Sequence, residues 1–191
     1  MAQRIVIIGG GPAGYEAALV GAKYGAEVTV VEDAGMGGSS VLWDCVPSKA
    51  FIAATGVRTD MRRADEMGLR PDFSQRKIDF TAVNERVKRL AQQQSDDVRA
   101  QMEREGIKML QGRGRLDDHD PGRVTHYVTV DLLEGGEVTL EADLVLVSTG
   151  ASPRILPGAI PDGDRILTWR QVYELEAVSY THLRAHETLR Y

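Results

Sequence analysis

Apolar and polar residues alternate at the amino end of the chain in the pattern of a strand–helix–strand unit. Residues 4–8, RIVII, form a β-branched apolar run that is typical of a strand buried on both faces. From residue 12 to Tyr24 the apolar positions follow helical spacing, and Gly25 is a natural stop. Residues 27–31 form a second apolar run that ends in Glu32. Two buried strands joined by a helix are therefore expected.

The middle of the chain predicts one long amphipathic helix over residues 81–105, which ends before Gly106. Its polar positions are expected to face solvent. The expected packing seam consists of Val83, Val87, Leu90, Ala91, Val98 and Met102.

Shorter apolar runs predict further strands. Residues 107–110 read as a strand that leads into Gly112-Arg113-Gly114, and residues 144–147 read as a buried strand. Residues 127–133 and 137–142, separated by Gly135-Gly136, predict an antiparallel hairpin. Strands and helices in this order indicate an α/β protein.

Composition narrows the function classes. The 191 residues, 42% of them hydrophobic, suffice for one sizeable core. With 23 basic and 28 acidic residues the net charge is −5, which argues against a nucleic-acid partner. The single cysteine, Cys45, excludes an intramolecular disulfide and fits a reducing compartment. No apolar run approaches the ~20 residues that span a bilayer. The expectation is a soluble, cytoplasmic protein.

The turn between the first strand and the helix carries the motif G-x-G-x-x-G. Gly9 permits a tight turn, Gly11 lets a pyrophosphate approach the backbone, and Gly14 allows close packing of helix and strand. Glu32 is placed to accept hydrogen bonds from ribose hydroxyl groups. The alternative is a glycine-rich turn without a ligand. The candidate cofactor-binding residues here are Gly9, Gly11, Pro12, Ala13, Gly14, Glu32 and Asp33.

Three later segments carry a family resemblance. Residues 37–49, GGSSVLWDCVPSK, resemble the redox-active segment of the pyridine nucleotide–disulfide oxidoreductases, the family of dihydrolipoamide dehydrogenase and glutathione reductase. Residues 148–153, STGASP, and 166–171, ILTWRQ, are similar to two further segments of that family.

The resemblance implies a Rossmann-like FAD-binding domain with a parallel sheet, crossover helices and a small antiparallel β layer. It implies FAD rather than NAD in the first nucleotide site, although the glycine motif itself fits both. The candidate cofactor residues that it adds are Gly38, Ser39, Lys49, Gly114, Thr149 and Gly150. For Gly114 a plain turn is the alternative.

The chain departs from the family pattern at Ser40, where the disulfide reductases have the first of two cysteines. A hydroxyl group cannot form the disulfide that passes electrons to a thiol substrate. The segment is similar to that of the actinobacterial NAD(P)H:quinone reductase branch, in which NAD(P)H reduces FAD and FAD reduces a quinone-like acceptor. The alternatives are a dihydrolipoamide dehydrogenase-type disulfide reductase and a nucleotide-binding module without redox activity.

Cys45 and Lys49 are the catalytic candidates that the resemblance implies. Cys45 is interpreted as a small buried residue, as a thiolate near the flavin, or as a thiol with an unseen partner. Lys49, one helical turn further on, would stabilise negative charge on reduced flavin, or would be a solvated surface charge. No metal site is expected, and His119 and His126 are interpreted as solvated loop residues.

The resemblance also implies that residues 1–177 are an incomplete FAD-binding domain, the amino-terminal portion of a longer homodimeric enzyme. The site for NAD(P)H would lie in the absent part, so this fragment is expected to be inactive by itself. Residues 178–191, VSYTHLRAHETLRY, break the preceding pattern and resemble the translation of a sequencing-library adapter. They are expected to be a non-native tail.

Overall fold

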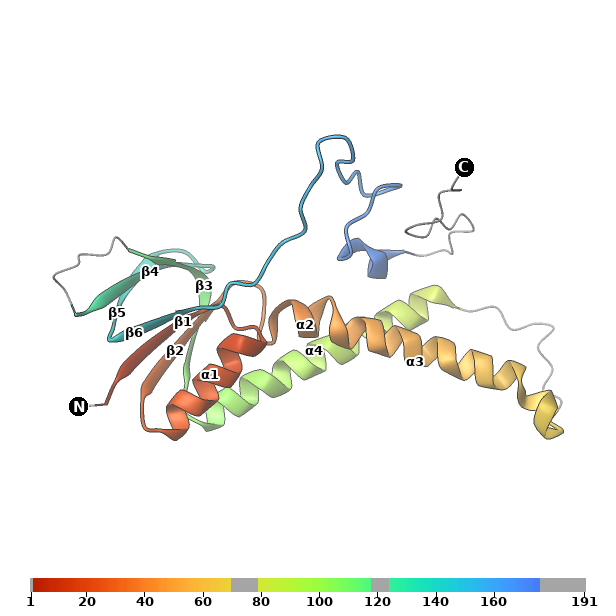
Figure 1. Ribbon diagram of the computed structural model, residues 1–191, viewed down its shortest axis with the longest axis horizontal. Helices are drawn as coiled ribbons and strands as arrows, with labels where there is room; N and C mark the ends of the chain where they lie inside the picture. Colours follow the sequence, from red (N-terminus) through yellow and green to blue (C-terminus); the bar gives the residue numbers. More distant parts are fainter. Residues whose placement is uncertain (1, 70–78, 118–123, 176–191) are drawn as a thin grey trace, which may run out of the picture.

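Six strands form one sheet in the described part of the chain (Figure 1). This computed structural model describes residues 2–69, 79–117 and 124–175, so the predicted tail and His119 lie outside the described residues. The strand order across the sheet is β5-β4-β3-β2-β1-β6. The strands are β1 (Arg4–Ile8), β2 (Glu27–Glu32), β3 (Lys108–Leu116), β4 (His126–Leu132), β5 (Glu137–Ala142) and β6 (Leu144–Val147).

The parallel half of the sheet is built around β1. This strand runs parallel to β2 on one side and to β6 on the other, and β2 runs parallel to β3. The predicted parallel sheet is therefore confirmed. The prediction that residues 144–147 are buried is wrong, because β6 lies at the edge of the sheet. Leu144 is 43% exposed and Val147 58% exposed, whereas Ile7 in β1 is 1% exposed.

Strand β3 changes partners along its length. Residues 108–111 pair in parallel with β2, and residues 112–116 pair in antiparallel with β4. The expected end of this strand at Leu110, with a turn at the following glycines, is wrong. Gly112 continues the strand because its backbone lies close against Asp131 of β4, where a side chain would have no room.

The antiparallel layer is the predicted hairpin. Strands β4 and β5 pair from His126 opposite Ala142 to Asp131 opposite Glu137. Gly135 and Gly136 form the turn, and both have positive φ values, of 96° and 91°. His126 therefore begins a strand, which corrects its assignment to a loop.

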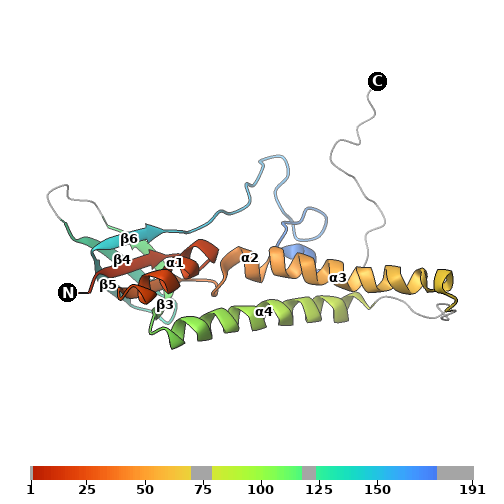
Figure 2. The ribbon, with the colours of Figure 1, turned by 60° about the horizontal axis from the view of Figure 1, so that its bottom comes forward.

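Four α-helices are described: α1 (Pro12–Lys23), α2 (Gly38–Leu42), α3 (Cys45–Arg62) and α4 (Phe80–Arg104). Two 3-10 helices, η1 (Ala64–Met67) and η2 (Gln171–Glu174), are shorter. Helix α1 makes the predicted crossover between β1 and β2. Figures 1 and 2 show α3 and α4 side by side as a long pair that extends away from the sheet.

Helix α4 matches the long helix that the periodicity predicted, within one residue at each end. The carboxylate of Asp79 caps it by accepting a hydrogen bond from the backbone N–H of Ala82, 2.9 Å away. Two polar residues that the sequence did not place in the seam, Asn84 and Ser95, are buried. Val83 and Leu90 are only half-buried. The buried face of α4 consists of Asn84, Val87, Ala91, Ser95, Val98 and Met102.

Two clusters of buried apolar residues hold these layers together. One lies between the parallel strands and helices α1 and α4 and includes Ile7 and Met102. The other lies between the parallel strands and the hairpin and includes Val6, Ile8 and Val130. Alternate residues of β1 point to opposite faces of the sheet, so this one strand contributes to both clusters.

A search of the described helices for a membrane span found none with the required length and apolar character.

Candidate functional site: a nucleotide-sized cleft at the edge of the parallel sheet

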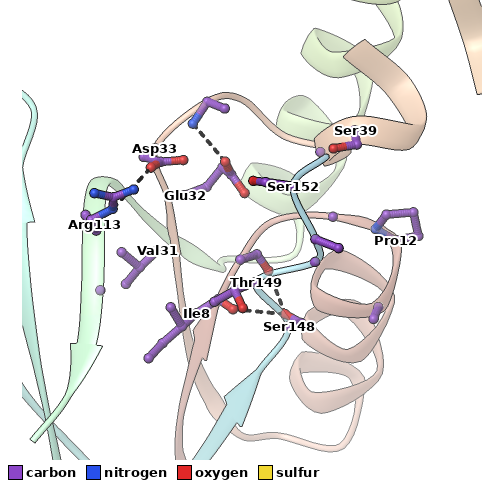
Figure 3. Close-up of a pocket in the computed structure, with 18 of the residues that line it drawn as sticks. Ile8, Pro12, Val31, Glu32, Asp33, Ser39, Arg113, Ser148, Thr149 and Ser152 are labelled. Atoms are coloured by element: carbon purple, nitrogen blue, oxygen red, sulfur yellow. Dashed lines mark hydrogen bonds and ion pairs between the residues drawn. The ribbon is translucent and has the colours of Figure 1, made fainter. Parts of the chain in front are cut away.

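A cleft of about 640 Å³ opens at the carboxyl ends of the parallel strands (Figure 3). The chain passes from β1 through α1 to β2 on one side, while β6 pairs with the other side of β1, so the strand order reverses here. Such a reversal is where open α/β sheets bind ligands, because the loops diverge from it. The volume lies within the range of about 300–1,000 Å³ that small-molecule sites occupy.

Gly9 and Gly14 close the turn between β1 and α1. Gly9 has a φ of +107°, and a Cβ there would collide with the carbonyl oxygen of Ser148. A Cβ on Gly14 would collide with the carbonyl oxygen of Gly9. Ser148 ties β6 to this turn, because its Oγ donates to the carbonyl oxygen of Gly9 at 2.9 Å (Figure 3). These glycines are therefore required by backbone packing.

Gly11 differs from both, because no heavy atom lies within 4 Å of the place where its Cβ would be. Its φ is −69°, which any residue can adopt, so conformational freedom does not explain a glycine here. Gly11 precedes α1, and no side chain caps this helix end. The first N–H groups of α1 and their partial positive charge lie beside the cleft, which Pro12 and Ala13 also line.

Glu32 ends β2 and lines the cleft. Its Oε2 accepts a hydrogen bond from the backbone N–H of Gly10 at 2.6 Å, and its Oε1 accepts one from that of Ala34 at 2.8 Å. The carboxylate thus joins the glycine turn to the end of β2. The predicted hydrogen bonds to ribose hydroxyl groups would add to this local role.

The β3 side of the cleft is formed by Gly112 to Arg115. Asp33 lies 3.8 Å from Arg113 in an ion pair across this rim (Figure 3). At Gly114 a Cβ would come within 3.1 Å of Ile8 and 3.3 Å of Val31. The interpretation of Gly114 as a plain turn is wrong, because it lies in β3 and lines the cleft.

The opposite end of the cleft is formed by the start of α2. Gly38 has a φ of +55°, and its Cβ would lie 2.9 Å from the Cα of Gly11, so α2 packs directly on the glycine turn. Ser39 and Ser40 line the cleft next to it. Thr149 and Gly150, which follow β6, also line the cleft.

Cys45 and Lys49 lie outside the set of residues that line the cleft. Both are exposed in the first turns of α3. The interpretation of Cys45 as a small buried residue is therefore wrong for this chain. The structure brings the other predicted residues together around one cleft, with Gly14 directly behind it.

Sequence reasoning assigned no role to Trp43, Arg113 or Arg170, which all line the cleft. Trp43 and Arg170 lie within segments that carried the family resemblance, but their side chains had no recognisable pattern. Trp43 and Arg170 lie close together only because two segments more than a hundred residues apart in the chain come into contact.

A model of the family described as pyridine nucleotide-disulphide oxidoreductase matches residues 3–186. The chain belongs to this family. An NAD(P)H dehydrogenase (quinone) from Mycobacterium tuberculosis is 54% identical over 181 residues, covering 93% of this chain and 37% of that protein. A dihydrolipoyl dehydrogenase from Chlorobaculum parvum is 33% identical over 174 residues, covering 91% of this chain and 35% of that protein.

Two solved structures agree with the fold. The crystal structure of LpdA from Mycobacterium tuberculosis has a TM-score of 0.85 and 52% identity, covering 92% of this chain and 38% of that chain. The flavoprotein disulfide reductase RclA from Escherichia coli has a TM-score of 0.64 at 21% identity, covering 82% of this chain and 30% of that chain, and it supports the fold alone. The chain thus spans little more than a third of the relatives that it matches.

Proposed function

We propose that this chain is the FAD-binding part of an NAD(P)H dehydrogenase that passes electrons from reduced flavin to a quinone-like acceptor. The open space at Gly11 supports a dinucleotide, because a methyl group would fill the place where a pyrophosphate approaches the start of α1. The cleft continues from Glu32 past this point to Ser39, which gives the second half of a dinucleotide room beside α2.

The observation that favours a quinone-like acceptor over a disulfide is Ser40. This residue lines the cleft in the position of the first family cysteine, and Cys45 is the one cysteine of the sequence. Bound FAD would supply the ability to accept two electrons from NAD(P)H and pass them on. The chain itself would bind the phosphates at α1, hold the ribose near Glu32 and place no second thiol beside the flavin.

The relatives named dihydrolipoyl dehydrogenase keep a disulfide reductase as the second candidate. That chemistry needs two thiols that exchange with a dithiol substrate. Ser40 removes one of them, so we place this activity second. In the full-length enzyme we further propose a homodimer in the cytoplasm, where the exposed thiol of Cys45 would stay reduced.

The test uses a chimera in which residues 1–177 replace the matched part of the Mycobacterium tuberculosis NAD(P)H dehydrogenase (quinone). We expect the purified chimera to be yellow from bound flavin, to oxidise NAD(P)H with a quinone, and to show negligible oxidation of dihydrolipoamide. A colourless chimera would contradict the FAD site. A yellow chimera with dihydrolipoamide activity and no quinone activity would favour the second candidate.

A further inference from the structure

Arg170 lies in the corner formed by two aromatic rings at the α2 end of the cleft. Its guanidinium carbon is 4.4 Å from the ring centre of Trp43 and 5.3 Å from that of Trp169. The two indole rings meet edge to face, with their centres 6.4 Å apart. Cation–π contacts of this kind fix the position of a guanidinium group without neutralising its charge.

The segment that carries Arg170 is anchored away from the cleft. The side-chain amide of Asn84 on α4 donates to the carbonyl oxygen of Leu175 at 2.7 Å, and Lys88 pairs with Glu174 at 2.6 Å. Tyr173 packs against Phe51 of α3, with ring centres 6.5 Å apart. These contacts place the turn before η2 against the long helices and present Arg170 to the cleft.

No carboxylate among the described residues forms an ion pair with Arg170, in contrast to Arg113 and Arg115 on the β3 side, which pair with Asp33 and Asp131. A fixed arginine that lines a cleft and retains its charge is suited to bind an anionic oxygen, because its N–H groups form charge-assisted hydrogen bonds. The two ring centres are only 6.4 Å apart, so the rings lie on adjacent and not opposite sides of the guanidinium group and do not enclose it. Its five N–H donors can therefore still serve a ligand.

We propose that Arg170 is a ligand-binding residue that recognises an anionic oxygen on the non-adenosine half of the dinucleotide. This inference rests on the proposed function, since Glu32 and the glycine turn define which end of the cleft receives the adenosine. Arg170 and Trp43 line the cleft beyond that turn, together with Ser39 and Ser40. The oxygen belongs either to a phosphate or to the flavin ring, and the two sources can be separated.

The chain carries its own reporter, because Trp43 and Trp169 are the two tryptophans of the sequence. The full 191-residue chain is titrated with ADP and with FAD, and tryptophan emission and calorimetry give the dissociation constants. Arg170→Gln removes the charge and Arg170→Lys retains it. Arg165→Gln is the matched control, because Arg165 is an exposed residue five positions earlier that does not line the cleft.

We expect Arg170→Gln to weaken FAD binding by about tenfold relative to Arg165→Gln, the loss of one charge-assisted interaction, and Arg170→Lys to recover part of it. Affinity should also depend less on salt in Arg170→Gln than in the wild type. Weaker binding of both ADP and FAD would assign the oxygen to a phosphate, and weaker binding of FAD alone would assign it to the flavin ring.

Three results would overturn the inference. If Arg170→Gln and Arg165→Gln bind both ligands equally well, Arg170 has no binding role, while the dinucleotide site stands. If Arg170→Gln and Arg170→Lys lose affinity equally and without a change in salt dependence, the residue only docks the segment on Trp43. If the wild-type chain binds neither ADP nor FAD, the same variants are compared by flavin content in the chimera, and a wild-type chimera without flavin overturns the proposed function together with this inference.

Discussion

At the scale of single residues, substitutions at Gly11 and Gly14 distinguish an effect on ligand binding from an effect on folding. The structure leaves open space for a methyl group at this position, whereas at Gly14 a methyl group would meet the backbone of Gly9. Gly11→Ala should therefore keep the thermal stability of the wild type and weaken ADP binding by roughly tenfold, about 1.4 kcal/mol. Gly14→Ala should instead lower stability by about 1–3 kcal/mol, the usual cost of overpacking.

Thermal unfolding and ADP titration of the two variants measure these effects side by side. Unchanged ADP affinity in Gly11→Ala would mean that no phosphate approaches the turn at this residue, and the dinucleotide site would have to be abandoned.

Cys45 provides a second residue-scale prediction, made on the chimera with the Mycobacterium tuberculosis enzyme. Because Ser40 leaves no disulfide partner, electrons should pass directly from reduced flavin to the quinone. Cys45→Ser should then keep quinone reduction within about tenfold of the unmodified chimera, roughly 1.4 kcal/mol in the barrier. Lys49→Ala should lower the rate more, since it removes a charge that the family resemblance places near the flavin.

Steady-state quinone reduction at matched flavin content tests both variants. A loss of several orders of magnitude in Cys45→Ser, with flavin still bound, would show that the thiol takes part in electron transfer.

At the scale of secondary-structure elements, a charged cluster joins the start of β1 to the end of β5 and to the residue that links β5 to β6, at the end of the sheet opposite the cleft. Arg4 of β1 pairs with Asp143 at 2.8 Å and with Glu141 of β5 at 2.6 Å. Hydrogen bonds from the Arg4 side chain and backbone lower the pKa of Asp143 to about 2. The unfolded chain has the ordinary value of about 3.9 for aspartate, so the folded state favours the ionised form.

The pKa difference of Asp143 predicts a pH-dependent contribution to stability. It should be fully present above about pH 4 and be lost as the pH falls through about 2, where the folded protein also takes up the proton. Asp143→Asn should therefore lower the urea midpoint at neutral pH, and its difference from the wild type should shrink on acidification. Because the pair is exposed, added salt should reduce the difference as well. A difference that does not vary with pH would assign the effect to packing.

At the scale of the whole molecule, the expected activity depends on the share of its relatives' length that the chain spans. It spans 37% of the Mycobacterium tuberculosis relative, and its 191 residues include one G-x-G-x-x-G motif. We therefore expect the chain alone to bind FAD weakly or not at all and to leave NAD(P)H unoxidised, while the chimera oxidises it. Nicotinamide absorbance, followed with FAD and a quinone present, measures both. Sustained turnover by the 191-residue chain would show that it contains a second nucleotide site.

The sequence by itself determined the unit that forms the cleft. A buried strand, a helix and a second strand follow from local periodicity, and the glycines at residues 9, 11 and 14 follow from the space that a turn and a phosphate need. The long helix and the hairpin were also predicted closely, because helical spacing and paired glycines are local signals. Family resemblance added the residues of α2 and of segment 148–152 that complete the cleft.

Other features depended on contacts between distant segments, which no local pattern contains. Strand β6 is exposed because it lies at the edge of the described sheet, and β3 continues through its glycines because β4 pairs with it there. Asn84 is buried because Leu175 returns to meet it, 91 residues later in the chain. Arg170 likewise gains its place only when the segment after β6 folds back onto Trp43. Periodicity records which face of an element is apolar, whereas only the tertiary structure decides what meets that face.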